Sequence, residues 1–292
     1  MPNTLLKLKQ RLPDFMRLMR FDRPIGTFLL LWPTLWALML AGDGKPPIGT
    51  VIIFTLGVIL MRAAGCVIND FADRKIDGHV KRTKDRPLAT GVIQPKEALI
   101  LFAALCITSF LLVLLTNSLT VYLSFGALVL AACYPFMKRH THLPQMVLGA
   151  AFAWAIPMSF AAVTGKVPAD AWFIYTIVVI WTLTYDTFYA MADRQDDVKI
   201  GVKSTAVLFG EMDRPITASL QCLVVMGLFM MGGKFDLGLI YTLSVVGVGA
   251  LFAYQQHLIR QREPQACIQA FLNNNYVGAI IFIGIALDPL VS

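Results

Sequence analysis

The amino-acid sequence predicts an all-α integral membrane protein that crosses the bilayer about nine times. Of the 292 residues, 57% are hydrophobic and only 15% are charged, whereas soluble domains carry about 25% charged residues. The apolar residues fall into long runs, and a run of about 20 is enough to span a bilayer. The basic residues gather in the loops of one side, which accounts for the net charge of +7 better than nucleic-acid binding does.

The boundaries of the nine segments follow from the residues between them. Residues 1–24 are basic and amphipathic and lack the apolar core of a signal peptide. Gly, Pro and polar residues break the chain at 42–47, 116–118, 165–168 and 232–234, and longer basic loops separate the other segments. The expected spans are 25–42, 48–71, 97–116, 119–137, 143–163, 170–191, 215–232, 236–256 and 268–288. No low-complexity linker divides the chain, so we expect a single domain over residues 1–292.

The distribution of Lys and Arg predicts the orientation. The chain contains 25 of these residues. Of them, 21 lie in the N-terminal stretch and in the loops after even-numbered segments, whereas the loops after odd-numbered segments contain only Lys45, Lys166 and Lys234. Because basic loops stay in the cytoplasm, we expect the N-terminus on the cytoplasmic side and the C-terminus on the other side.

The second segment ends in an acidic motif, Asn69-Asp70-Phe71-Ala72-Asp73-Arg74-Lys75-Ile76-Asp77. A helix turns about 100° per residue. If the helix continues through the whole motif, one stripe carries five polar side chains, namely Arg62, Asn69, Asp70, Asp73 and Asp77. We expect this stripe to run from inside the membrane to the cytoplasmic surface.

A second acidic motif ends the sixth segment and runs from Asp186 to Asp197. On a helix, Asp186, Asp193 and Asp197 share a face with Ala190, whose small side chain leaves room for a ligand. Both motifs follow even-numbered segments, so we expect them at the same, cytoplasmic surface.

The chemistry of the two motifs points to a divalent cation. Carboxylates are costly in hydrocarbon, so acidic clusters there are candidate functional sites. A solvated helix end with local ion pairs explains any single Asp, but it does not explain the same pattern in two distant segments. Crowded carboxylates repel one another unless a cation neutralises them. Oxygen ligands without His or Cys favour Mg²⁺ or Mn²⁺ over zinc, and such a cation can hold a diphosphate.

Basic residues lie in the loops of the same side, including Arg86, Lys138, Arg139 and Lys203. Each alone is explained by membrane topology, but together with the acidic motifs they predict a clamp for a diphosphate leaving group. Arg62 lies about two turns deeper than Asn69, where an arginine needs an anionic partner. That partner is either a substrate carboxylate or an aspartate of the same helix.

These residues resemble the UbiA-type intramembrane aromatic prenyltransferases. The family pattern N-D-x-x-D-x-x-x-D is met by Asn69, Asp70, Asp73 and Asp77, and D-x-x-Y-A-x-x-D-x-x-x-D is met by Asp186, Tyr189, Ala190, Asp193 and Asp197. The resemblance covers residues 17–285 and is greatest to the bacterial branch that acts on 4-hydroxybenzoate, through segments such as Arg23-Pro24-Ile25-Gly26 and Tyr134-Pro135-Phe136-Met137-Lys138-Arg139.

The resemblance implies nine spans around a central cavity, with a cytoplasmic cap, in the bacterial inner membrane and with a periplasmic C-terminus. It implies Mg²⁺-assisted transfer of a polyprenyl group from polyprenyl diphosphate to the ring carbon ortho to the phenol of 4-hydroxybenzoate, a step of ubiquinone biosynthesis. The diphosphate departs, the ring attacks the resulting allylic cation, and a proton is lost. Apolar and aromatic walls would shield the cation from water.

Position and resemblance together suggest a role for each candidate. Metal binding is assigned to Asp73, Asp77, Asp193 and Asp197, with Asn69, Asp70 and Asp186 as further ligands or their supports. Diphosphate binding is assigned to Arg86, Lys138 and Lys203. Arg62 and Arg139 are alternatives for the acceptor's carboxylate, and Tyr134 and Tyr189 would orient the diphosphate or flank the cation.

Two other functions compete with this interpretation. A cation-coupled transporter also contains membrane acids, but it favours acids near the bilayer midplane and inverted repeats with broken helices. Here the acids gather at one interface. The second alternative is an enzyme of the same family that prenylates a naphthoate or homogentisate. The preferred length of the prenyl chain does not follow from the sequence.

Overall fold

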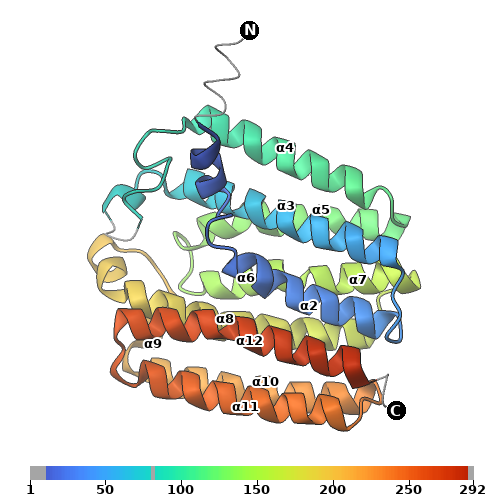
Figure 1. The fold of residues 1–292 in the computed structure, drawn as a ribbon. Helices are drawn as coiled ribbons and strands as arrows, with labels where there is room; N and C mark the ends of the chain where they lie inside the picture. Colours follow the sequence, from blue (N-terminus) through green and yellow to red (C-terminus); the bar gives the residue numbers. More distant parts are fainter. Residues whose placement is uncertain (1–10, 80–82, 289–292) are drawn as a thin grey trace.

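The computed structural model describes residues 11–79 and 83–288, which form helices and no strand and pack as a bundle of roughly parallel and antiparallel rods (Figure 1). Residues 11–18 are helical. The expected N-terminal stretch up to residue 10, Lys81 and Arg82 of the first basic loop, and the last four residues lie outside the described part. The long helices are α2 (Ile25–Ala41), α3 (Ile48–Asp73), α4 (Pro95–Val113), α5 (Ser118–Met137), α6 (Pro144–Ala153), α7 (Ala155–Thr164), α8 (Ala169–Ile200), α10 (Asp213–Lys234), α11 (Leu239–Leu258) and α12 (Pro264–Leu287).

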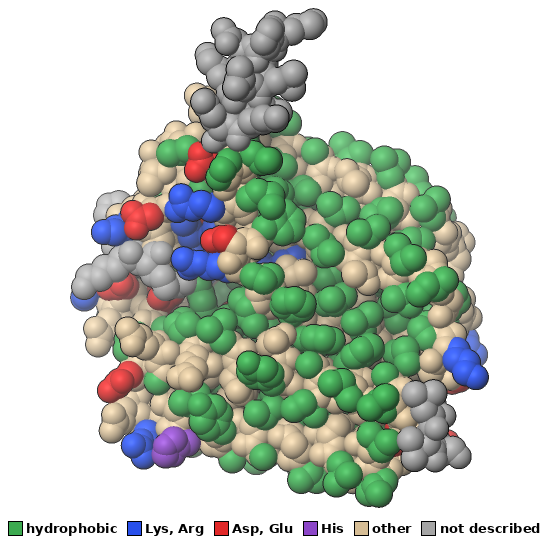
Figure 2. Space-filling view, viewed as in Figure 1, with side chains coloured by type: hydrophobic (Ala, Val, Ile, Leu, Met, Phe, Trp, Pro, Cys, Tyr) green, Lys and Arg blue, Asp and Glu red, His purple; other side chains and the backbone are tan. Residues whose placement is uncertain are grey.

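The number of spans agrees with the prediction. Eight helical stretches of the described chain are long and apolar enough to cross a membrane, and the shorter apolar helix α2 supplies a ninth. Figure 2 shows apolar side chains over most of one face, with charged side chains gathered mainly at its left-hand end. Large side chains such as Leu111 and Val129 are more than half exposed, which is costly in water and is expected against lipid.

The fifth span is divided into α6 and α7, whereas the sequence predicted one continuous segment. The helix breaks at Trp154. Pro157 has no N–H to donate to the carbonyl of Ala153, so the ladder of hydrogen bonds is interrupted there. The indole Nε1 of Trp154 instead donates to the carbonyl of Leu123 on α5, at 2.8 Å, which ties the break to a neighbouring helix.

The two acidic motifs end their helices differently. Helix α8 continues to Ile200, well beyond the expected end at residue 191, so the whole second motif is helical. Helix α3 ends at Asp73, and Asp77 lies in a separate 3₁₀ turn, η1 (Asp77–His79). The prediction of one helical stripe from Arg62 to Asp77 is therefore wrong beyond Asp73. A turn follows the helix, in which the Ile76 N–H donates to the Asp73 carbonyl at 2.7 Å, and this turn changes the direction of the chain.

The inner helices surround a common centre. Helix α12 packs against α2, α8 and α11, α2 also packs against α3 and α7, and α6 packs against α5 and α8. Helix α4 lies outside α3, and α10 and α11 lie on the opposite side of the bundle (Figure 1). Buried polar contacts join the inner helices: Trp36 donates to the Gly278 carbonyl at 3.0 Å, and Trp181 donates to Asn274 at 2.8 Å. Such hydrogen bonds stabilise helix association where lipid cannot.

The basic loops meet at one end of the bundle. Arg17 donates to the Asp85 carbonyl at 3.2 Å, which places the N-terminal segment beside the loop after α3. The backbone N–H of Lys203 donates to the Lys138 carbonyl at 3.4 Å, which joins the loops after α8 and α5. At the other end, Lys234 pairs with Asp170. Both acidic motifs therefore share one end, as the alternation of basic and non-basic loops predicted.

This arrangement makes a topology prediction. Reporter enzymes fused after Arg86 and after Lys203 are expected to show cytoplasmic activity, and fusions after Lys45 and after Lys166 are expected to show external activity, because basic loops are retained in the cytoplasm. Paired reporters that are active only in the cytoplasm or only outside measure this. The reverse result at any of the four positions would contradict the nine-span topology.

Candidate active site

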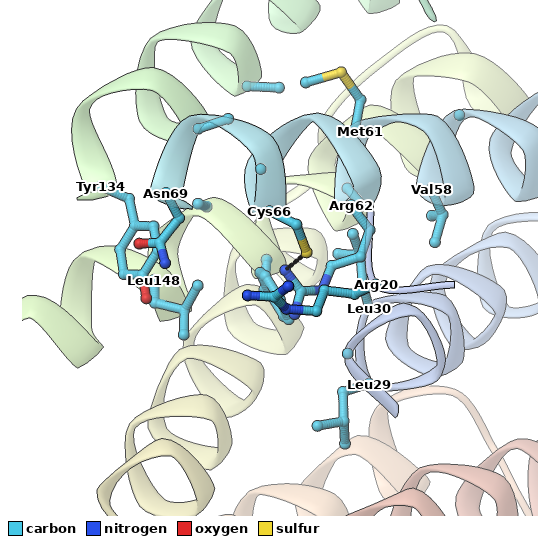
Figure 3. Close-up of a pocket in the computed structure, with 18 of the residues that line it drawn as sticks. Arg20, Leu29, Leu30, Val58, Met61, Arg62, Cys66, Asn69, Tyr134 and Leu148 are labelled. Carbon is cyan, nitrogen blue, oxygen red and sulfur yellow. Dashed lines mark hydrogen bonds between the residues drawn. The ribbon is translucent and has the colours of Figure 1, made fainter. Parts of the chain in front are cut away.

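A cavity of about 1100 Å³ lies among the inner helices. Near the end that carries the acidic motifs, its lining is charged and includes Arg17, Arg20, Arg23, Asp70, Asp85, Arg86 and Asp186. Its walls from α3, α4 and α5 are apolar and include Ile53, Phe54, Val58, Ile107, Phe110, Phe125 and Leu128. Part of the lining is drawn in Figure 3. The cavity suits a ligand with a charged head and a long apolar tail.

The cavity brings together residues from both acidic motifs. Asn69 and Asp70 enter it from α3, Asp186 and Tyr189 enter it from α8, and Tyr134 enters it from α5. The other expected residues, namely Asp73, Asp77, Arg139, Lys138, Lys203, Asp193 and Asp197, lie outside its lining at the same end of the bundle. The candidate site thus has an inner part in the cavity and an outer part beside its mouth.

Asp70 and Asp77 are joined through Arg86. The Arg86 guanidinium lies 3.0 Å from Asp70 Oδ1 and 3.0 Å from Asp77 Oδ2. Asp70 is only 1% exposed, and Arg20 contacts both its oxygens, at 2.8 and 2.9 Å. Burying a carboxylate is tolerated when such charged partners surround it. Burial acts to lower the pKa of Arg86, but Asp70 and Asp77 outweigh burial and raise the pKa above its ordinary value, so this side chain stays positively charged.

Asp73 lies beside the mouth and is paired on one side only. Lys138, at the end of α5, forms an ion pair with Asp73 Oδ2. Asp73 Oδ1 is buried and has no hydrogen-bond partner among the described residues. Arg139 does not enter the cavity lining; its Nη2 donates to the Ala72 carbonyl at 2.6 Å. Lys203 Nζ lies 3.5 Å from the His140 carbonyl, so its side chain lies beside the loop that follows α5.

The outer part of α8 is anchored to the loop that follows it. Arg194 lies between Asp193 and Asp197 in sequence and donates to the Gly210 carbonyl at 3.2 Å. It also contacts Asp213, which is fully buried and accepts hydrogen bonds from Arg262 Nε at 3.0 Å. The half-buried aspartates of the second motif are therefore held on a helix whose end is fixed by an ion-pair cluster.

The arrangement of the carboxylates shows where Mg²⁺ could bind. No three His, Cys, Asp or Glu side chains within residues 11–79 and 83–288 are grouped closely enough to hold a metal ion. Arg86 lies between Asp70 and Asp77, and Lys138 pairs with Asp73. The buried Asp73 Oδ1 without a partner is an unfavourable arrangement that a hard cation would relieve. The donor chemistry therefore fits Mg²⁺ at Asp73, provided that the flexible Lys138 side chain turns aside.

Arg62 lies about two helical turns deeper along α3 than Asn69. Its Nη1 donates to Cys66 Sγ at 2.9 Å, as the dashed line in Figure 3 shows, and its guanidinium lies 5.9 Å from the centre of the Phe152 ring. Arg62 Nε is buried and lacks a hydrogen-bond partner in the described part of the chain. The ion pairs of Asp70 and Asp73 are with Arg20, Arg86 and Lys138, so the pairing of Arg62 with an aspartate of its own helix is not observed.

Several lining residues received no role from the sequence. Arg20 and Cys66 are two of them, because the sequence pattern gave no reason to place either side chain in the site. Arg20 reaches Asp70 across 50 positions, and no local spacing distinguishes it from an arginine that only controls topology. A signal for Cys66 did exist, because it lies one helical turn after Arg62 and therefore on the same face.

A cavity that joins a charged mouth to apolar walls inside a helical membrane protein fits an enzyme that acts on a lipid with a charged head. The sequence model of the UbiA prenyltransferase family matches residues 30–279, and this chain belongs to that family. Its sequence is 61% identical over 285 residues to the 4-hydroxybenzoate octaprenyltransferase of Saccharophagus degradans, covering 98% of this chain and 95% of the relative. It is 60% identical to the 4-hydroxybenzoate octaprenyltransferase of Hahella chejuensis, covering 99% and 97%.

Solved structures confirm the all-helical fold. The apo structure of a UbiA homologue from Aeropyrum pernix K1 superposes with a TM-score of 0.80 at 25% identity, covering 89% of this chain and 97% of the other. A UbiA homologue from Archaeoglobus fulgidus, bound to GPP and Mg²⁺, superposes with a TM-score of 0.71 at 19% identity, covering 94% and 99%. At this identity the second likeness shows the fold alone.

Proposed function

We propose that this prenyltransferase transfers a polyprenyl group from polyprenyl diphosphate to the ring carbon ortho to the phenol of 4-hydroxybenzoate, giving 3-polyprenyl-4-hydroxybenzoate for ubiquinone biosynthesis. The observation that carries the proposal is the cavity, with a charged mouth, apolar walls and a deep arginine. The high identity to 4-hydroxybenzoate octaprenyltransferases over nearly the whole chain supports the choice of substrates.

The charged mouth would bind the diphosphate. Arg86 and Arg20 line the cavity there, and Lys138 lies beside it. Asp73, Asp77, Asp193 and Asp197 would hold Mg²⁺, with Asn69, Asp70 and Asp186 as supports. When bound, Mg²⁺ neutralises negative charge on the leaving diphosphate. The arginines and Lys138 act in the same direction, because fixed positive charge in a site that excludes water stabilises a departing anion strongly.

The bond between the first prenyl carbon and the diphosphate oxygen breaks, and the diphosphate leaves with the electron pair. The ring carbon of the acceptor then forms a bond to the allylic cation and loses its proton, which restores the aromatic ring. Tyr189 lines the cavity and packs against Phe271, with ring centres 5.0 Å apart. Aromatic faces of this kind stabilise a cation, and we assign Tyr134 and Tyr189 to that role or to orienting the diphosphate.

Arg62 would bind the acceptor's carboxylate. It lines the cavity about two helical turns deeper along α3 than Asn69, and its Nε is left without a hydrogen-bond partner within the described residues. Arg139 is the weaker candidate, because its guanidinium donates to the end of α3. A carboxylate held at Arg62 would place the phenol end of the ring toward the diphosphate. The same proposal puts the charged mouth on the cytoplasmic side of the bacterial inner membrane.

Membranes containing this protein test the proposal directly. Labelled 4-hydroxybenzoate and a mixture of polyprenyl diphosphates are expected to give a labelled lipid whose mass equals the acceptor plus one prenyl group minus one hydrogen. Mass spectrometry identifies the product and the chain length. Unlabelled naphthoate or homogentisate is expected to compete weakly; prenylation of either of these in preference to 4-hydroxybenzoate would contradict the proposed acceptor.

A further inference from the structure

We infer that Gly26 and Cys66 are positioning residues that orient the Arg62 guanidinium toward the acceptor's carboxylate. The inference rests on the proposed role of Arg62. Gly26 is the second residue of α2, Cys66 lies on α3, and both line the same cavity as Arg62.

Gly26 leaves space that no other residue would leave. A Cβ atom at this position would lie 2.3 Å from Arg62 Nε, 2.3 Å from Nη2 and 2.7 Å from Cζ. These distances are well inside van der Waals contact, which for such atoms begins at about 3.5 Å. Because the Cβ would be equally close to the two nitrogens and farther from Cζ, it would stand in front of the edge that Nε and Nη2 form. Since a Cβ lies about 1.5 Å from its Cα, the Gly26 backbone already packs against that edge, and only glycine allows α2 to approach the guanidinium so closely.

Cys66 holds the other side of the same group. Its Sγ accepts a hydrogen bond from Arg62 Nη1 at 2.9 Å, and Cys66 lies one helical turn from Arg62, where side chains of a helix meet. The Phe152 ring adds a cation–π contact. The guanidinium is therefore held by Cys66 at Nη1 and packs against the Gly26 backbone along its Nε–Nη2 edge.

A substitution at Gly26 is expected to move Arg62 rather than to unfold the protein. The atoms that a Cβ would meet belong to the far end of a long, flexible side chain, and no backbone atom is among them. Alanine also favours a helix more than glycine does. The consequence is a folded enzyme in which the guanidinium has left its position.

The matched variants are Gly26→Ala and Gly49→Ala. Gly49 is likewise the second residue of its helix and likewise follows a Pro-Ile pair, but a Cβ there would meet no atom within 4 Å. Gly26→Ala is expected to raise the KM for 4-hydroxybenzoate about tenfold, with the KM for polyprenyl diphosphate and the kcat at saturating acceptor nearly unchanged. Gly49→Ala is expected to match the unsubstituted protein in all three values.

Two further comparisons separate positioning from a general structural effect. In an Arg62→Ala background, Gly26→Ala is expected to raise the acceptor KM no further, because residues that act through one another are not additive. Cys66→Ala is expected to raise the acceptor KM about threefold, as loss of one weak hydrogen bond would. Cys66→Ser is expected to restore it, because the hydroxyl accepts the same hydrogen bond.

The outcomes distinguish this inference from the proposed function. If Arg62→Ala leaves the acceptor KM unchanged, the proposed role of Arg62 fails, and the inference fails with it. If Arg62→Ala raises the acceptor KM but Gly26→Ala behaves like Gly49→Ala, the inference is wrong and the proposed function stands. A full additional effect of Gly26→Ala in the Arg62→Ala background also overturns it. Should Gly26→Ala yield no folded enzyme, equal acceptor KM values for Cys66→Ala and Cys66→Ser decide against the inference.

Discussion

Asp73→Asn is expected to lower turnover by roughly 10²–10³-fold, as loss of a preorganised charge in an active site does, while the protein still inserts and folds. Asparagine keeps the shape of the side chain, and the ion-pair partner, Lys138, is 21% exposed and can turn to solvent. What disappears is a carboxylate whose Oδ1 is buried without a partner in the described structure, which we assign to Mg²⁺. Single-turnover release of diphosphate from labelled prenyl diphosphate measures the effect.

Asp170→Asn is the control for that substitution. Asp170 also pairs with a lysine, Lys234, but at the opposite end of the bundle, and the two side chains are 39% and 43% exposed. Exposed ion pairs contribute about 0–1 kcal/mol, so turnover and folding are expected to stay the same. Excess EDTA is expected to abolish the activity of the unsubstituted protein. Full activity in EDTA, or turnover of Asp73→Asn equal to that of Asp170→Asn, would rule out metal binding at Asp73.

The spans could be predicted from the sequence because run length and loop charge are local properties. Helix α3 begins at the expected residue, Ile48. The break in the fifth span was not predicted, although Pro157 is a sequence signal for it. The helical stripe was correct where the helix is continuous: Arg62, Asn69 and Asp70 share the cavity. It failed at Asp77, since angular arithmetic holds only until the helix ends, and the end depends on a turn that the hydrophobic pattern does not mark.

Ion pairs between distant segments could not be predicted from the sequence. The acids were expected at one surface of the membrane, but the sequence did not indicate that Asp70 is surrounded by Arg20 and Arg86. Patterns of charge identify which side of the membrane a loop lies on, but they do not say which arginine meets which aspartate. The same limit applies to Gly26, whose importance follows only from the guanidinium that lies against it.

Arg62→Ala is expected to raise the KM for 4-hydroxybenzoate about tenfold or more, with a much smaller change in the KM for polyprenyl diphosphate. A charge-assisted hydrogen bond contributes about 1.5–3 kcal/mol, and about 1.4 kcal/mol corresponds to a factor of ten in affinity. Steady-state kinetics with each substrate varied in turn measures both constants. Arg62→Lys is expected to recover only part of the loss, because lysine cannot bind a carboxylate through two parallel hydrogen bonds.

Arg139→Ala is the control for the Arg62→Ala substitution. Arg139 is also positively charged, but it lies at the end of the bundle, where its guanidinium donates to the Ala72 carbonyl at 2.6 Å and lies outside the cavity lining. Its loss is expected to leave the acceptor KM within about twofold, because no contact with the acceptor is removed. An acceptor-specific defect in Arg139→Ala, together with a normal acceptor KM in Arg62→Ala, would move the carboxylate to the mouth. In that case the acceptor ring would have to approach the allylic cation from the side of the diphosphate rather than from the depth of the cavity.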